Sequence, residues 1–383
     1  MPRMLSEPRR IVISTDTVGG VWTYALDLAR ALADRGIEVV LMIVGPSASV
    51  SQRRSVDAIG GVTPVVADLP LDWAARDERE LVDAGEAFFN QCRAFDPDVI
   101  HLNSPGFAAT LAREEAASRT PLVVGLHSCV ASWWSAVFPG IDLPPDLAWQ
   151  LAIVRRGLAR ADAVIVPSHA FAAAIKPHYG HGLDIEVIPN GRHLSNGGGR
   201  QAGAGGLVLT AGRLWDQGKN VATLDRAAAQ LAMPIEAAGP VCEPRRGAVA
   251  AAFHHLRLVG ELDRAAMQDR LDEAGIFVSA AIYEPFGLAV LEAAQARCAL
   301  VLSDIPTFRE LWDGAAVFVE PSDAYGFARE IERLRADGAA RLAMADAAAR
   351  RAGGFGIDAM ATETAALYGR VAACRLASVG APA

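Results

Sequence analysis

The sequence predicts an α/β protein of two doubly wound domains, and three observations support this prediction. The 383 residues exceed what one hydrophobic core usually supports. Short apolar runs alternate with helical patterns along both halves of the chain, which is typical of parallel sheets covered by helices. A glycine-dense segment without hydrophobic periodicity, residues 191–206, separates the two halves and is expected to be a linker. We therefore expect domains at residues 1–190 and 207–365.

The first half opens with a strand, a glycine-containing loop, a helix and a second strand, which together predict a parallel β-α-β unit. The helix is expected from about Trp22 to Arg35, and Gly36 closes it. Helical patterns lie between the later apolar runs. The predicted strands of this half are residues 10–15, 37–44, 98–102, 121–126, 163–168 and 185–190.

The second half repeats this alternation after the linker. Helices are predicted at residues 221–232 and 288–297, and the alanine-rich residues of the 350s to 370s are also helical in pattern. The predicted strands are residues 207–211, 235–238, 256–259, 276–280, 299–302 and 316–319.

Composition narrows the classes of protein that the chain can represent. The net charge of −8 argues against a nucleic-acid binder, which would present a basic face. No apolar segment approaches the roughly 20 residues that span a bilayer, and no signal peptide is recognised at the N-terminus. The five cysteines are widely spaced and odd in number, which favours reduced thiols in a cytoplasmic protein. Peripheral contact with the inner face of a membrane stays open, although no clear basic amphipathic helix is present.

The most informative motif is a strand-to-helix turn bracketed by two carboxylates, Glu284 and Glu292. Backbone N–H groups of Gly287, Leu288 and Ala289 would lie at the helix N-terminus, where unpaired donors and the helix dipole favour a diphosphate. Glu292 lies on the same helix face as Leu288, and an ionised carboxylate suits a ribose diol, which offers two O–H donors. In the alternative interpretation, Glu284 only interacts with the positive end of the helix dipole and Glu292 is a solvent-exposed helix residue.

A second candidate motif is the loop at residues 212–220, which follows the first strand of the second half. It carries Arg213 and Lys219, which can converge on one anion. The chain has two lysines, Lys176 and Lys219, in a lysine-plus-arginine total of 36. Because lysine is so rare here, its presence in this loop favours a specific role. A solvated loop lysine is the alternative interpretation.

With this spacing, the run from Glu284 through Pro285, Phe286 and Gly287 to Glu292 resembles the donor-site signature of glycosyltransferase family four, a family of retaining enzymes with the GT-B fold. The resemblance implies two Rossmann-like domains facing a central cleft. It implies transfer of a hexose from a UDP-, GDP-, ADP- or TDP-sugar to a glycan, a lipid-linked sugar or a small molecule, with no metal, no other cofactor and no enzymic nucleophile.

The resemblance also assigns roles to individual residues. Glu284 would hold sugar hydroxyls, Glu292 the ribose, Arg213 and Lys219 the diphosphate, and Phe286, Gly287, Leu288 and Ala289 would complete the donor site. Gly19 and Gly20, in the first loop, would lie against the donor phosphates and the acceptor. His127 follows the strand at 121–126 and would line the sugar pocket. Residues 366–383 would cross back to the first domain.

Some features depart from the family or stay open. Arg192 and His193 replace the usual valine and aspartate after Gly191, and Arg297 and Ala299 replace a glycine and a proline. The paired tryptophans at 133 and 134 either stack on sugar rings or pack in the core. The Asp96-Pro97-Asp98 run has the form of a metal-binding D-x-D but is also an ordinary turn. A GT-B epimerase or hydrolase, and a degenerate nucleotide-sugar-binding subunit, are the alternative functions.

Overall fold

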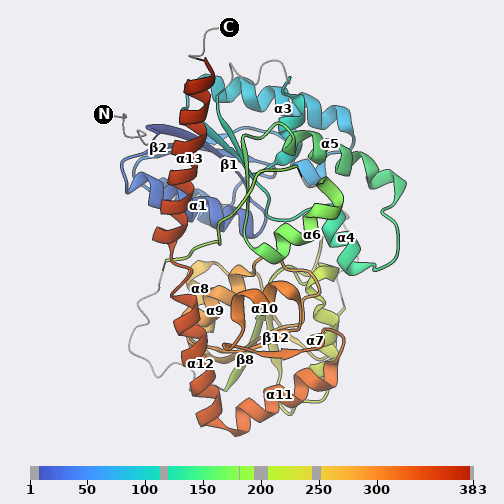
Figure 1. The fold of residues 1–383 in the computed structure, drawn as a ribbon. Coiled ribbons are helices and arrows are strands. Elements are labelled where there is room, and N and C mark those ends of the chain that lie inside the picture. Colours follow the sequence, from blue (N-terminus) through green and yellow to red (C-terminus); the bar gives the residue numbers. More distant parts are fainter. Residues whose placement is uncertain (1–7, 113–119, 181, 194–205, 244–251, 380–383) are drawn as a thin grey trace. The chain divides into compact units, whose positions relative to one another are not determined.

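The computed structural model describes residues 8–112, 120–180, 182–193, 206–243 and 252–379. They form two compact units, each built on one parallel sheet with helices around it (Figure 1). The first unit contains residues 8–135, 140–191 and 357–379, and the second contains residues 136–139 and 192–356, in both cases as far as they are described. The predicted fold class of two Rossmann-like domains is confirmed. Most of the predicted linker, residues 194–205, lies outside the described residues.

The sheet of the first unit has seven strands in the order β3-β2-β1-β4-β5-β6-β7. Each neighbouring pair is parallel, and β1 lies in register between β2 and β4. Because all these pairs are parallel, the carboxyl ends of all seven strands lie at one edge of the sheet. The strands are β1 (Arg10–Asp16), β2 (Glu38–Val44), β3 (Val62–Val66), β4 (Val99–Leu102), β5 (Leu122–Gly125), β6 (Ala163–Val166) and β7 (Ile185–Val187).

Strand β3 was absent from the sequence-based prediction. It contains Pro64, and each of its residues is at least partly exposed. Proline has no N–H to donate, so it is tolerated in a strand at the edge of a sheet, which is where β3 lies. The threonine and the proline interrupt its valines, so β3 lacks the continuous apolar run that identified the buried strands.

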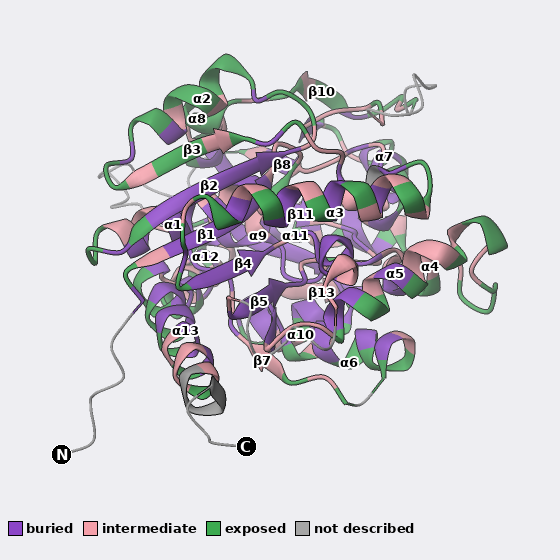
Figure 2. Ribbon diagram, turned by 90° about the horizontal axis from the view of Figure 1, so that it is seen from above, coloured by how far each residue is buried: buried purple, intermediate pink, exposed green. Residues whose placement is uncertain are grey.

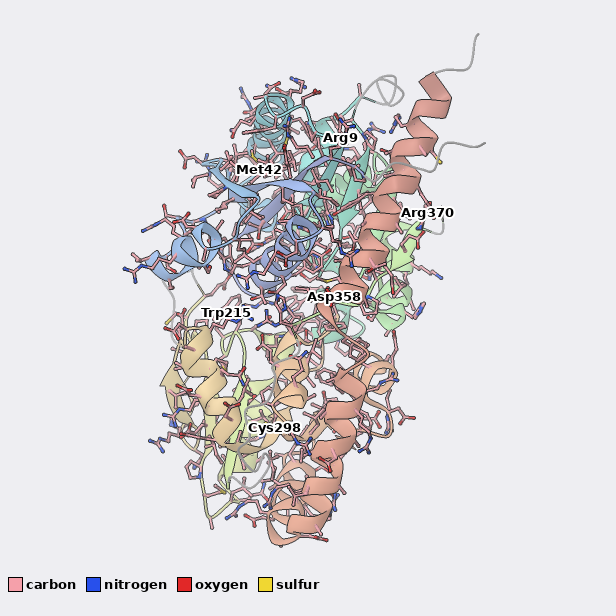
Figure 3. All side chains as sticks on the ribbon, turned by 90° about the vertical axis from the view of Figure 1, so that its left-hand side faces the viewer. Arg9, Met42, Trp215, Cys298, Asp358 and Arg370 are labelled. Carbon is pink, nitrogen blue, oxygen red and sulfur yellow. The ribbon has the colours of Figure 1, made fainter. Side chains whose placement is uncertain are left out.

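Helix α13 (Ile357–Val379) belongs to the first unit, where it packs against α1 (Gly20–Ala33). Arg35 donates to the carbonyl oxygen of Asp358 at 3.0 Å, and Arg370 pairs with Glu186 at 2.6 Å. Figure 3 labels Asp358 and Arg370 near the start and along the length of this helix. The return to the first unit therefore starts at Ile357, nine residues before the expected 366.

The remaining helices of the first unit are α2 (Val50–Asp57), α3 (Glu78–Arg93), α4 (Val130–Val137), α5 (Ala148–Leu158) and α6 (His169–Tyr179), with short 3-10 turns η1 (Asp72–Ala74), η2 (Pro105–Thr110) and η3 (Pro145–Leu147). Figure 2 shows the central strands buried and the outward faces of α2 and α3 exposed. This separation is what helices with one apolar stripe produce when they cover a sheet. Within the described residues, no helix is long and apolar enough to cross a membrane.

The second unit has a six-stranded sheet in the order β10-β9-β8-β11-β12-β13. Its neighbouring pairs are also parallel. The strands are β8 (Leu207–Ala211), β9 (Ile235–Ala238), β10 (Arg257–Gly260), β11 (Ala274–Ser279), β12 (Ala299–Ser303) and β13 (Val317–Val319). The helices are α7 (Val221–Ala228), α8 (Arg264–Glu273), α9 (Leu288–Gln295), α10 (Pro306–Trp312), α11 (Ala324–Ala336) and α12 (Gly338–Ala352), with a short turn η4 (Gln217–Lys219).

Candidate active site

The turn between β11 and α9 is shaped by Gly287, which is the N-cap of α9 at φ +94°. This left-handed conformation favours glycine. A Cβ at this position would lie 3.2 Å from the Phe308 ring and 3.4 Å from Cγ of Glu284. The glycine therefore lets Glu284 and the first amides of α9 lie close together. Leu288 and Ala289 are partly exposed there, whereas the Phe286 side chain is 3% exposed and packs edge-on against Phe355. Phe286 can thus offer a ligand its backbone rather than its ring.

Lys219 and Glu284, predicted independently from two loops, form an ion pair. Their side chains are 22% and 14% exposed. The loops are also joined through their backbones, because the carbonyl oxygen of Gly218 accepts from the N–H groups of Ile282 at 2.9 Å and Tyr283 at 3.1 Å. The lysine and the glutamate are therefore held together by the fold as well as by their charges.

Arg213 lies on the same loop as Lys219 but contacts a different carboxylate. Its guanidinium donates to Asp216 at 2.8 Å and lies 5.6 Å from the centre of the Trp215 ring, which is labelled in Figure 3. Asp216 also accepts from the N–H of Gly218 at 2.8 Å and so caps η4. Each of the two expected phosphate-binding cations is thus already paired with a carboxylate in this structure.

Asn220 fixes the end of this loop, a role that the sequence analysis missed. Its side-chain amide donates to the carbonyl oxygens of Ala280 at 2.9 Å and Pro321 at 2.8 Å. Its backbone is left-handed at φ 51°, a region that asparagine tolerates better than most residues. An asparagine directly after the lysine and before a helical pattern was the available signal.

A second missed residue is Arg192, which pairs with Glu292 at 2.7 Å. The arginine side chain is 10% exposed and the glutamate side chain 24% exposed. The residue that replaces the family's usual valine therefore contacts the carboxylate expected to bind ribose. The departure at position 192 was visible in the sequence, but its partner lies 100 residues away and was not.

Lys219 and Glu284 line a small hollow in the second unit, at the carboxyl ends of β8 and β11. Another backbone segment lies close to the lining residue Gly212, since a Cβ on Gly239 would lie 1.8 Å from the carbonyl oxygen of Gly212. The lining includes Gly212, Leu214, Lys219, Ser279, Glu284 and Ala289. The first turn of α9, a lysine and a carboxylate thus lie around one space, an arrangement that suits a phosphorylated, hydroxyl-rich ligand.

The first unit carries the other predicted residues. Gly19, at φ +82°, is the N-cap of α1, and Gly20 is the first residue of that helix; both are exposed. His127 follows β5, and its Nε2 lies 2.9 Å from Oδ1 of Asn103. The Tyr24 ring packs 4.3 Å from the imidazole, and burial lowers the pKa of His127 to about 4. The histidine is therefore neutral near pH 7.

Two sequence features acquire a structural explanation. Asp98 accepts from the N–H groups of Arg9 at 2.7 Å and Arg10 at 3.0 Å, so it secures the start of β1. The Trp133 and Trp134 rings lie 6.4 Å apart and are partly exposed, and the Trp134 indole N–H donates to the carbonyl oxygen of Ile141 at 2.9 Å. The tryptophans are thus not fully buried in the core.

Two Rossmann-like units, each built on one parallel sheet, are the architecture of the GT-B fold. Residues 18–196 match the family described as Glycosyltransferase Family 4, and residues 205–337 match Glycosyl transferases group 1. The chain belongs to these glycosyltransferases.

Individual relatives cover most of the chain. The chain is 28% identical to a phosphatidyl-myo-inositol mannosyltransferase of Mycolicibacterium smegmatis over 86% of each protein. It is 27% identical to a glycogen synthase of Mycobacterium tuberculosis, over 92% of this chain and 91% of the relative.

Solved structures share the fold. A sucrose-phosphate synthase from Thermosynechococcus elongatus superposes with a TM-score of 0.76 at 20% identity, covering 96% of this chain and 100% of that one. Anabaena HepE, solved in complex with UDP-glucose, superposes with a TM-score of 0.71 at 17% identity. The match covers 94% of this chain and 98% of that one.

Proposed function

We propose that this glycosyltransferase is a retaining enzyme that moves a hexose from a nucleoside-diphosphate sugar to a hydroxyl group of an acceptor. The Lys219–Glu284 pair beside the first amides of α9 is the observation that carries the proposal. A cation and free N–H groups suit a diphosphate, and a carboxylate next to them suits sugar hydroxyls. Relatives named for mannosyl transfer and for glycogen synthesis, and a GT-B protein solved with UDP-glucose, support a hexose donor.

The chemistry would proceed without an enzymic nucleophile. The acceptor oxygen bonds to the anomeric carbon on the face from which the diphosphate departs, the bond from that carbon to the phosphate oxygen breaks, and this oxygen takes the acceptor proton. Lys219, Arg213 and the α9 amides stabilise the negative charge that grows on the leaving group, which is the interaction that lowers a barrier. Glu292 would hold the ribose.

In this mechanism, binding of the donor breaks the Lys219–Glu284 ion pair, and each of the two side chains then contacts the donor instead. The diphosphate attracts Lys219 away from Glu284, and the carboxylate is then available for the hydroxyls of the hexose. Similarly, Arg213 can turn from Asp216 to the diphosphate, since the arginine side chain is 37% exposed. The pairs keep both cations in place in the absence of a ligand.

Donor identity can be tested by thermal unfolding with UDP-, GDP-, ADP- and TDP-sugars. One donor should raise Tm, because a ligand at 100 times its Kd stabilises the folded state by about 2.7 kcal/mol. The ligand-induced shift should be lost in Glu292→Gln and kept in Glu332→Gln, a control in which the altered side chain is 45% exposed in a surface pair with Arg335. No shift with any donor would contradict the proposal, whereas binding without turnover would favour the degenerate binding subunit.

Metal independence is a separate prediction of the proposed mechanism. Because Lys219 and Arg213 supply the positive charge, turnover in excess EDTA should stay within about twofold of the untreated rate, a difference of under 1 kcal/mol in the barrier. Initial rates would be compared with and without EDTA, and then after adding back Mg²⁺ or Mn²⁺. Loss of activity that either ion restores would show that a divalent cation takes part.

A further inference from the structure

Three polar side chains of the first unit converge over Gly125, the last residue of β5. A Cβ on this glycine would lie 2.2 Å from Oδ1 of Asn103, 2.8 Å from Nε2 of His101 and 3.1 Å from Nε2 of His127. No side chain larger than hydrogen fits among these atoms. The glycine therefore creates the space in which an asparagine and two histidines meet.

The orientation of the Asn103 amide follows from its other contact. Its Nδ2 donates to the carbonyl oxygen of Ser14 at 2.7 Å, and a backbone carbonyl can only accept. The N–H of Asn103 also donates to the Ser14 hydroxyl at 2.7 Å, which fixes the backbone beside β1. Oδ1 must then be the atom that faces His127, at 2.9 Å from its Nε2. Because Oδ1 is an acceptor, Nε2 of His127 carries the proton.

The surroundings of the imidazole disfavour a second proton. Among the described residues, the titratable groups near it include Tyr24 from α1 and His101 from β4, with Tyr368 from α13 behind His101. None of these three is a carboxylate that would stabilise an imidazolium. Burial lowers the pKa of His101 to about 3, and its Nδ1 lies 2.5 Å from the hydroxyl oxygen of Tyr368. His127 thus faces neutral partners.

We propose that Asn103 is a positioning residue that holds His127 as the neutral imidazole protonated on Nε2, so that Nδ1 is left as an acceptor for a sugar hydroxyl. The part played by His127 toward the sugar rests on the proposed function. The tautomer itself rests on the Ser14–Asn103–His127 contacts alone. A residue that only filled space at position 103 would leave the ring free to adopt either neutral tautomer.

The first test is ¹⁵N NMR of the full-length protein labelled at histidine, with His127 assigned by its loss in His127→Gln. The expected wild-type spectrum shows His127 protonated on Nε2 and unprotonated on Nδ1 from pH 6 to 8. Protonation on Nδ1, or a titration near the ordinary histidine pKa of about 6.5, would overturn the proposal. The wild-type spectrum decides this point even where a variant fails to fold, and it requires no donor or acceptor.

Two variants then separate positioning from packing. Asn103→Asp places a carboxylate next to Nε2–H, which should raise the pKa of His127 and make transfer rise with pH as the ring loses its second proton. Asn103→Leu removes the acceptor, so the tautomers should mix and kcat/KM should fall about tenfold, as expected for one lost hydrogen bond. Asn90→Asp, exposed on α3, is the control and should change neither property.

A variant Asn103→Leu that keeps the wild-type tautomer would count against the proposal. A correct tautomer without transferase activity would instead contradict the proposed function.

Discussion

Lys219→Ala should lower kcat/KM by roughly 10²–10³, the scale for losing one preorganised group that stabilises charge in the transition state. The lysine pairs with Glu284 in this structure and is 22% exposed, so its charge is only partly screened by water. The loss should appear mainly in kcat, because the negative charge on the diphosphate increases as the bond to the sugar breaks. Removal of the lysine also leaves Glu284 without this partner, which should lower the stability of the second unit.

The chain provides a matched control for this experiment. Lys176, the other lysine, is exposed on α6, and Lys176→Ala should retain wild-type kinetics. Initial rates with a fixed acceptor and varied donor would separate kcat from KM, and circular dichroism would verify that both variants are folded. Turnover of Lys219→Ala within a few-fold of the wild type would remove Lys219 from the mechanism.

The contact between Lys219 and Glu284 illustrates what the sequence could predict. Apolar runs located β8 and β11, and both residues were placed on the loops that follow these strands. The two strands are neighbours in the parallel sheet, and neighbouring parallel strands end at the same edge. The pattern of apolar runs and polar loops in the sequence is therefore enough to place the two residues on loops that can meet.

Contacts that depend on a particular side-chain pairing could not be predicted in this way. Asn103 and His127 lie after neighbouring strands, yet the amide orientation that fixes the imidazole depends on Ser14 in a third strand. In the sequence, Arg192 was recognised only as a departure from the family pattern, because no nearby residue indicates its pairing with Glu292. The return of the chain to the first unit was also placed too late, since the continuous alanine-rich pattern does not reveal the break between α12 and α13.

The Arg192–Glu292 pair gives the largest stability effect that we expect. Arg192→Leu should lower the free energy of unfolding of the second unit by about 2–3 kcal/mol, because it leaves a mostly buried carboxylate without its arginine. The double variant Arg192→Leu with Glu292→Leu should recover most of this loss, since replacing both members of a buried pair by apolar residues is often nearly neutral. Recovery of this kind would show that the pair itself adds little net stability, so that its contribution has to be sought in donor binding.

The comparison is made by guanidinium unfolding, with Arg297→Leu as the control. Arg297 pairs with Asp346 in the same unit, but the side chains are 48% and 43% exposed, so its loss should cost less than about 1 kcal/mol. The Arg192→Leu variant should also bind the donor more weakly than the wild type, because the Glu292 carboxylate is no longer held by the arginine in one orientation. Equal stability losses for Arg192→Leu and Arg297→Leu, together with unchanged donor affinity, would mean that Arg192 contributes no more than an exposed arginine and does not position Glu292.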